Sequence, residues 1–419
     1  ITMSATAVLI VSALLLVISF ITARHNRTIF GTGLGGDWFA FHNAATILNQ
    51  HNPARLYDLQ LQSHLYHNQL PDEPPEACLP YANAPFLADA FRSFGLMPYA
   101  WSYATWTVLS LLMFITGLTF AWRAADLPRE QLGFGLLVCL SFEPLSMECI
   151  HGGQISAIAV LLFSSAIYLH LSHRQLFAGA ILSFCIYKPT LLPIVMLMLL
   201  VTRQWRVIAG FFIGTFIIVL FSCMMLGITP WLNYFKILMQ YVAFNTSSAG
   251  QTVFRTWKFI DLNSFLKLLH LPPTAIALML LIVTIAAVRE AMRIWHSDWK
   301  DDPDRIRLAW ACALTGTLVL NIYVGIYDSV LVLPGLLLLA GTLRRRDGVE
   351  WAVYRCAAVA IFLLPWFSQI VAVWVGFQPY SLGLMILLFL QYQLLSDQNP
   401  SLQSDNTKVS HITSTMKLV

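Results

Sequence analysis

Apolar runs long enough to cross a membrane recur along the whole chain, and they constrain its fold more than any other feature. Each run has about 17 to 22 residues, and a helix of that length crosses a hydrocarbon core of about 30 Å. The runs are continuous rather than alternating, which excludes a transmembrane barrel. Charged residues make up only 11% of the chain, against about a quarter in soluble domains. We therefore predict an all-α polytopic membrane protein.

We expect about twelve membrane segments. Ten are predicted as single helices at 3–23, 101–122, 132–149, 154–171, 206–226, 274–293, 306–322, 329–343, 352–374 and 379–395. The remaining stretch, 175–202, is interrupted by Lys188-Pro189 and Pro193. A proline deep in a helix removes a hydrogen bond and kinks the chain. Two half-length helices that meet at Lys188-Pro189, with their turn inside the protein, therefore fit better than one straight span.

The orientation follows from the short loops, whose lysines and arginines gather on one side of the predicted membrane. That side is expected to be cytoplasmic, and the alternation of the spans then places both termini there. Two long loops, 24–100 and 227–273, lie on the extracytoplasmic face, and the first shows the pattern of amphipathic helices at a membrane surface. We treat 1–395 as one transmembrane domain and expect a disordered cytoplasmic tail at 396–419. The predicted location is a bacterial inner (plasma) membrane.

The first apolar run lacks a basic leader and a small-residue cleavage site. We expect it to be a retained membrane helix rather than a signal peptide.

Several classes of ligand are disfavoured. The net charge is only +4 and no basic patch is visible, so we expect no nucleic-acid partner. Six of the seven cysteines lie in or at apolar segments and indicate no disulfide framework. His64 and His67 could share a helix face and bind zinc, but no thiol or carboxylate completes such a site. We therefore predict no metal and no cofactor.

One acid, Asp37, lies in the run Gly35-Gly-Asp-Trp-Phe39, where the first predicted span meets the long polar loop. An aspartate before an apolar helical pattern often caps the helix. The same carboxylate could act as a general base that takes a proton from an attacking hydroxyl. The helix N-terminus would orient it, and the glycines would let the backbone approach a ligand closely. Both interpretations remain open on the sequence.

Two further places could bind an anion. Gly153-Gln154 opens the fourth predicted span, with His151 just before it, and free N–H groups at a helix N-terminus attract phosphate. A tight helical hairpin is the alternative there. Lys188 is a lone cation in a long apolar stretch, which is costly unless the ammonium is paired or solvated. It would neutralise a phosphate leaving group or snorkel to the interface from a helix end.

Other candidates lie in the second half of the chain and in the third span. Asp328 shares a predicted extracytoplasmic turn with Tyr323 and Tyr327. The acid and the two phenols could hydrogen-bond the hydroxyls of a sugar, although a helix cap also explains Asp328. Arg255 and Lys258, among interfacial aromatic residues of the second long loop, would bind a lipid head group or anchor the loop. Glu143 and Glu148 should face the interior of the bundle.

Several of these runs, in their order along the chain, resemble the polyprenol-phosphate-mannose-dependent mannosyltransferases of glycosyltransferase family 87, within the GT-C superfamily. These runs are residues 35–45, 52–58, 81–86, 151–156, 178–182 and 187–190, and a weaker similarity is visible at 321–328. The run Tyr81-Ala-Asn-Ala-Pro85 departs from the Tyr-x-Tyr-Pro-Pro type run that is frequent in that family. The resemblance implies a GT-C fold that transfers a sugar from a lipid phosphate with inversion. Matched to that motif, Asp37 would be the base.

The predicted function is therefore that of an inverting transferase that moves a hexose, mannose above all, from a polyprenyl-phosphate donor to a lipid or glycan acceptor. Lys188, with Gln154 and His151, would hold the donor phosphate. Membrane lipids are the other expected partners, and the sequence leaves protein partners open. Two alternatives stay open: a non-catalytic membrane-complex subunit with a transferase-like fold, and a lipid or solute transporter, which should show internal pseudo-symmetry between its halves.

Overall fold

The computed structural model describes residues 2–74, 77–246, 256–295, 302–344 and 349–397. The described chain is 79% helical and contains no β-strand. Arg255 and most of the predicted tail at 396–419 lie outside the described residues. The predicted all-α architecture is confirmed.

Six helical stretches among the described residues are long and apolar enough to cross a membrane. They are α1 (Thr2–Thr22), α5 (Tyr99–Ala124), α10 (Trp205–Leu226), α14 (Pro273–Trp295), the stretch Ile326–Leu343 formed by η8 (Ile326–Leu331) with α16 (Val332–Leu343), and α19 (Pro379–Asp397). A seventh is obtained if α17 (Val349–Leu363) and α18 (Pro365–Val375), which are bent by 64°, count as one broken span. The expected count of twelve is not confirmed.

The remaining helices are shorter. They are α2 (Trp38–Gln50), η1 (Pro53–Arg55), α3 (Leu59–Gln69), α4 (Pro85–Ala90), η2 (Arg92–Leu96), η3 (Arg129–Gln131), α6 (Leu132–Leu140), η4 (Pro144–Cys149), α7 (Ser156–Leu171), α8 (Gln175–Leu182), η5 (Ser183–Tyr187), η6 (Pro189–Leu191), α9 (Pro193–Val201), α11 (Thr229–Thr246), η7 (Thr256–Lys258), α13 (Leu262–Leu268) and α15 (Pro303–Val319).

Breaks in the helices fall at prolines. The predicted interruption at Lys188-Pro189 is confirmed: α8 ends at Leu182, short 3₁₀ turns follow, and α9 begins at Pro193. The single spans predicted at 132–149 and 352–374 are also interrupted. In the first, α6 ends at Leu140 and the π-helical turn η4 begins at Pro144. The second bends where α18 begins at Pro365.

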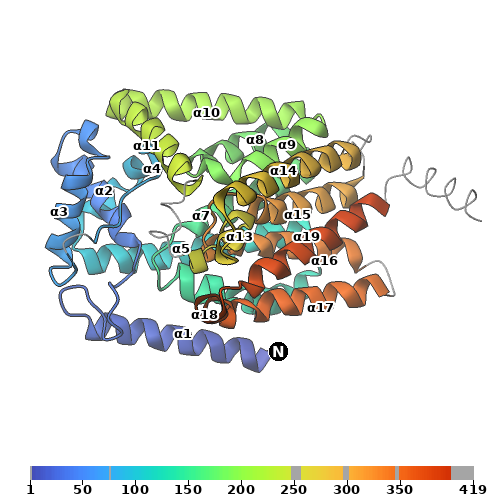
Figure 1. Cartoon of the computed structure of the whole chain (residues 1–419), viewed down its shortest axis with the longest axis horizontal. Coiled ribbons are helices and arrows are strands. Elements are labelled where there is room, and N and C mark those ends of the chain that lie inside the picture. Colours follow the sequence, from blue (N-terminus) through green and yellow to red (C-terminus); the bar gives the residue numbers. More distant parts are fainter. Residues whose placement is uncertain (1, 75–76, 247–255, 296–301, 345–348, 398–419) are drawn as a thin grey trace, which may run out of the picture.

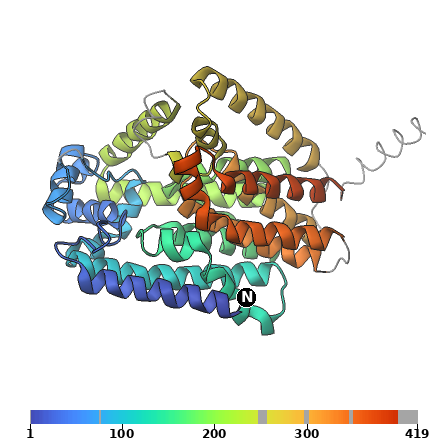
Figure 2. The same cartoon turned by 60° about the horizontal axis from the view of Figure 1, so that its bottom comes forward.

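The long helices lie side by side, and α2, α3 and α4 gather at one end of them (Figure 1). The start of α1 points away from that end, and α19 ends on the side opposite to it, before the tail. The view turned by 60° shows the same segregation (Figure 2). One end of the molecule therefore carries the residues of the first long loop, which we call the cap, and both ends of the described chain lie away from it.

Aromatic side chains fix the cap to the helices. Trp38 of α2 stacks on Trp106 of α5 with ring centroids 4.7 Å apart, and its indole N–H donates to Ser102 Oγ at 3.0 Å. Phe39 stacks on Tyr99 at 4.0 Å. Helices appear at both places predicted in the first loop, but α2 is buried over most of its length rather than lying on a surface. The residue that precedes Trp38 is therefore held rigidly over the helices.

Two glycines bring α8 and α10 into direct backbone contact. A Cβ on Gly179 would lie 1.9 Å from the carbonyl oxygen of Val207, and one on Gly210 would lie 2.1 Å from that of Leu176. Small residues allow such close approach in membrane bundles. This contact fixes the helix that leads into Lys188.

Candidate active site

A cavity of about 210 Å³ lies where the cap meets the helices. We call it the site cavity. Residues predicted for the site line it, among them Asp37, Gln154, Lys188 and Tyr327. They come from the start of α2, the turn before α7, the break between α8 and α9, and η8. The fold thus brings together residues that are far apart in the sequence.

Two glycine turns position the first pair. The N–H of Asp37 donates to the carbonyl oxygen of Gly152 at 2.9 Å. A Cβ on Gly153 would lie only 2.2 Å from the carbonyl oxygen of Gly35, and Gly153 itself has a φ of +62°. Only glycine fits such a left-handed position with backbone against it. The Gly35-Gly36 and Gly152-Gly153 turns therefore touch directly, and each places its following side chain in the cavity.

The Asp37 side chain does not cap α2. Asp37 occupies the N-cap position, but its carboxylate accepts no hydrogen bond from the first turn of the helix. Instead Oδ2 accepts a hydrogen bond from the side-chain amide of Gln154. Of the two interpretations left open by the sequence, the structure disfavours a role of the Asp37 carboxylate as the N-cap of α2. The carboxylate is held toward the cavity by an amide that cannot take its proton.

Removal from water raises the pKa of Asp37 to about 6. Lys258 opposes this shift most strongly among the charged groups, Glu148 adds to it, and Lys188 opposes it. A carboxylate with a pKa of about 6 is still mostly ionised at neutral pH, and it is a stronger base than an ordinary aspartate. Lys258 of η7, for which the sequence suggested lipid head-group binding or anchoring of the loop, is thus a second cation near the site.

Lys188 is held by a buried acid. Its ammonium donates to Asp328 Oδ2, and Ser156 Oγ donates to the other carboxylate oxygen at 2.9 Å. Asp328 is 1% exposed, whereas the Lys188 side chain is 18% exposed and lies 5.0 Å from the centroid of the Tyr327 ring. Such a pair compensates a charge inside the protein and leaves part of the Lys188 side chain toward the cavity.

Two predicted residues do not line the cavity. Asp328 lies behind Lys188 rather than on the surface of the cavity, so it is not placed to contact a ligand directly. His151 faces α1, where its Nε2 is 3.1 Å from Ser12 Oγ, and it lines a separate cavity between α1 and η4. A third, Arg255, lies outside the described residues.

The cavity also contains polar residues that the sequence did not single out as site residues. Tyr187, Thr190 and Asn83 line it, as does Tyr234. Tyr323, which the sequence groups with Tyr327 as a possible sugar-binding residue, lines the cavity as well. Thr190 Oγ1 is buried without a hydrogen-bond partner among the described residues. Asn83 and Thr190 lie in the short runs 81–86 and 187–190, so the signal for them was present. Tyr234 comes from α11, where no motif marks it.

The two intramembrane glutamates lie in the interior as predicted. Glu148 Oε1 accepts a hydrogen bond from the side-chain amide of Gln369 at 2.5 Å. Glu143 is 8% exposed, and its Oε2 has no partner in the described part of the chain. Within that same part, no group of three or more His, Cys, Asp or Glu side chains could hold a metal ion.

The fold and the site define a helical integral-membrane protein with a carboxylate and a lysine in one cavity at the end of its helices. The sequence model of glycosyltransferase family 87 matches residues 81–321, more than half of the chain. The chain belongs to this family and is a membrane glycosyltransferase, which requires a sugar donor and an acceptor. The match includes Gln154 and Lys188, while Asp37 precedes it and Tyr327 follows it. Comparisons with curated proteins and with solved structures found no match.

Proposed function

We propose that this glycosyltransferase moves a hexose, mannose above all, from a polyprenyl-phosphate donor to a lipid or glycan acceptor, with inversion at the anomeric carbon. The observation that carries the proposal is the presence of Asp37 and Lys188 in one cavity. A base and a fixed cation are the two groups that such a transfer needs. The site would face the extracytoplasmic side of a bacterial inner membrane, with both termini in the cytoplasm.

The reaction needs one base and one stabilised leaving group. Asp37 takes the proton of the acceptor hydroxyl, whose oxygen forms a bond to the anomeric carbon from the face opposite the phosphate. The bond between that carbon and the phosphate oxygen breaks, and the polyprenyl phosphate leaves with the electron pair. Lys188 stabilises the charge that develops on the phosphate. One displacement inverts the anomeric centre, so a second catalytic carboxylate is not required.

The neighbours of these two residues have supporting roles. Gln154 fixes the orientation of the Asp37 carboxylate through its amide. Asp328 positions Lys188 from behind. The Thr190 hydroxyl, buried and unpartnered among the described residues, lines the same cavity and suits a hydroxyl of the sugar or an oxygen of the phosphate.

The open site cavity favours an active enzyme over a subunit that has lost its activity. A volume of about 210 Å³ remains beside Asp37, with an unpartnered hydroxyl and a partly exposed cation in its wall. Burying a carboxylate that does not cap its helix costs stability. A subunit that had lost its activity would have no reason to retain such a group.

Transfer from a polyprenyl-phosphate mannose by the purified protein tests the proposal, with Asp37→Asn as the decisive variant. Asparagine keeps the shape of the side chain but cannot accept a proton, so kcat should fall by about 10²- to 10⁴-fold. Asp58→Asn is a matched control, because Asp58 lies in the same cap and bonds the N–H groups of Gln60 and Leu61 at the start of α3, a role that asparagine performs equally well. Full activity of Asp37→Asn would contradict the assignment of Asp37 as the base. If the protein transferred a sugar from no polyprenyl-phosphate hexose, the proposed class of donor would be wrong.

A further inference from the structure

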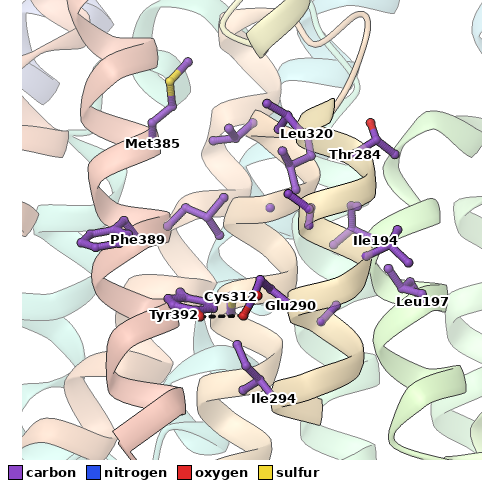
Figure 3. Close-up of a pocket in the computed structure, with 18 of the residues that line it drawn as sticks. Ile194, Leu197, Thr284, Glu290, Ile294, Cys312, Leu320, Met385, Phe389 and Tyr392 are labelled. Carbon is purple, nitrogen blue, oxygen red and sulfur yellow. Dashed lines mark hydrogen bonds between the residues drawn. The ribbon is translucent and has the colours of Figure 1, made fainter. Parts of the chain in front are cut away.

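Two spaces other than the site cavity differ in how they relate to it. A cavity of about 510 Å³ lies among the long helices, between α9, α14, α15 and α19 (Figure 3). Its polar groups pair with one another, since Tyr392 donates its hydroxyl hydrogen to Glu290 Oε2 at 2.8 Å, the dashed line in Figure 3. This cavity shares no lining residue with the site cavity. A groove in the cap, in contrast, borders the site cavity directly.

We call this second space, of about 670 Å³, the cap groove. One face of α3 lines it with Ser63, His64 and His67, and the chain that follows α3 lines it with Cys78 and Pro80. Pro80 also lines the site cavity. The same residue therefore forms a wall of both spaces.

Pro80 belongs to a short segment, residues 77–80, which we call the strap. Its last two residues, Leu79 and Pro80, line the site cavity. Directly after the strap, the backbone N–H of Tyr81 donates to Gln62 Oε1 at 2.7 Å, and both side chains are buried. Neither group changes its charge near neutral pH, so this end of the strap is fixed to α3 independently of pH.

The other end of the strap is fixed to α3 through one carbonyl oxygen, that of Pro74. This oxygen accepts a hydrogen bond from the backbone N–H of Ala77 at 2.8 Å. It also lies 2.9 Å from Nε2 of His67. His67 thus holds the first residue of the strap against α3 through a shared acceptor.

Both ring nitrogens of His67 face carbonyl oxygens. Nε2 faces that of Pro74, and Nδ1 lies 2.8 Å from that of Ser63. A neutral imidazole has one N–H and can donate to only one of them, whereas the imidazolium donates to both. The hydroxyl of Ser63 is the other group near Nδ1, but at 3.4 Å it is farther away than the carbonyl oxygen. The geometry therefore fits the charged form of the ring.

The charged neighbours of the ring come from two other segments. Glu73, beside Pro74, favours the imidazolium, and Arg27 from the segment after α1 pairs with Glu73 at 3.7 Å. The other titratable groups near the ring are His64, Tyr66 and Cys78. The nearest negative charge therefore acts in the same direction as the two carbonyl oxygens.

These contacts raise the pKa of His67 above the ordinary value of 6.5. The carbonyl oxygen of Pro74 contributes most and that of Ser63 next; partial burial opposes the rise, and Glu73 adds to it. A group whose pKa is raised by folding makes its bonds below that pKa and loses them as pH rises through it. The neutral ring keeps the bond to Ser63, which lies within one helix, because the bond to Pro74 also restrains a second segment of chain.

We propose that the His67 imidazolium positions the strap and thereby shapes the wall of the site cavity, so that the enzyme binds its donor more tightly at mildly acidic pH on the cap side. The proposal rests on the proposed function, since it takes the site cavity as the place where the donor binds. His67 acts through Pro80, so it is a positioning residue and not a catalytic one.

KM for polyprenyl-phosphate mannose, measured between about pH 6 and about pH 8, tests the proposal, because histidine changes its charge in this range. In the unmodified enzyme KM should rise with pH by about two- to fivefold, since one hydrogen bond is lost. Glutamine does not titrate, so His67→Gln should keep KM near the alkaline value at every pH. His64→Gln is the matched control. His64 lies on the same face of α3 and bonds Asn68 of its own helix, so this variant should keep the pH dependence of the unmodified enzyme.

A variant that leaves His67 in place checks the direction of the effect. Glu73 favours the imidazolium, so Glu73→Gln should move the rise in KM to lower pH. The pH profile of kcat, which Asp37 determines, should stay unchanged in all three variants. Two results would overturn the proposal: a rise of KM with pH in His67→Gln that equals the rise in the unmodified enzyme, or a shift to higher pH in Glu73→Gln.

The thiol of Cys78, in the strap, gives a readout that does not depend on transfer. In a Cys356→Ser background, a water-soluble maleimide should modify Cys78 more slowly in the otherwise unmodified protein than in His67→Gln at about pH 6, and equally fast in both at about pH 8. Comparing the two proteins at each pH cancels the ionisation of the thiol. Equal rates at both pH values would contradict the positioning of the strap. If Cys78 responds as expected but no polyprenyl-phosphate hexose is a donor, the proposed function fails and the role of His67 in the strap stands.

Discussion

Asp37 occupies the position where an aspartate ordinarily caps a helix, but its carboxylate instead accepts a hydrogen bond from the side-chain amide of Gln154. Such a cap is typically worth about 1 kcal/mol, and α2 forgoes it. The helix is stable without it because Trp38 and Phe39 anchor its first turn by stacking on α5. Aromatic burial thus leaves the carboxylate available for chemistry. The proposed base and its helix are held by different residues.

The pKa of Asp37 predicts how the rate depends on pH. Burial raises this pKa to about 6, and a general base must be ionised, so kcat should rise with pH through about 6 and then level off. Lys258 lowers the pKa of Asp37, so Lys258→Met should move the rise in kcat to higher pH. Glu148 raises it, so Glu148→Gln should move the rise to lower pH. A pH profile of kcat for the three proteins measures these shifts, and displacements of the opposite sign would contradict the assignment of Asp37.

A double substitution separates the two roles of Lys188. Removing either partner of its pair with Asp328 leaves the other charge buried, which costs about 3–5 kcal/mol. Lys188→Met with Asp328→Asn removes both charges and should recover most of that stability. The rate should stay depressed by about 10²-fold or more, because no cation then faces the leaving phosphate.

Unfolding in detergent and transfer assays on the two single variants and the double variant provide the two readouts. Recovery of wild-type kcat in the double variant would show that the pair is structural alone.

At the scale of elements, the contact between the two glycine turns should be indispensable. Gly153→Ala places a Cβ 2.2 Å from the carbonyl oxygen of Gly35, in addition to the strain of a φ of +62°. Gly31→Ala is the matched control, since Gly31 has a φ of +78° and open space around its Cβ position. The control should lose only about 1–2 kcal/mol and keep its activity.

Gly153→Ala should lose more stability and most of its kcat, because the turn must move and carry Gln154 away from Asp37. Stability and kcat of both variants check this expectation. Equal behaviour of the two would show that the turns need not touch.

Prolines explain why some helix breaks were predicted and others were not. Lys188-Pro189 interrupts a run that is too long for one span and places a charge in it, so both length and chemistry indicated a break. Pro144 and Pro365 lie in runs of ordinary length, where a proline can be accommodated as a kink. The structure breaks the chain at both. The tertiary environment, which the sequence pattern does not contain, decides between a kink and a break.

At the scale of the whole molecule, the candidate site could be predicted only in part. The sequence indicated Asp37, Gln154, Lys188 and Tyr327 one by one, and topology placed them on one face. It could not indicate that Gln154 bonds Asp37, 117 residues away, or that Asp328 pairs with Lys188 across 140 residues. Those pairings depend on how the helices pack. His151 was grouped with Gln154 because they are close in sequence, yet the turn between them directs the two side chains into different cavities.

The segregation of the cap from the chain ends makes the orientation in the membrane testable. Gln60 is exposed on α3 in the cap, and Glu130 is exposed in η3 between α5 and α6. In a background with Cys78 and Cys356 replaced by serine, a membrane-impermeant maleimide should label Gln60→Cys in right-side-out vesicles. Glu130→Cys should be labelled only after the vesicles are permeabilised, because the basic residues near it favour the cytoplasmic side. Labelling of Glu130→Cys alone in sealed vesicles would invert the proposed orientation, and the site cavity would then have to draw its donor from the cytoplasmic leaflet.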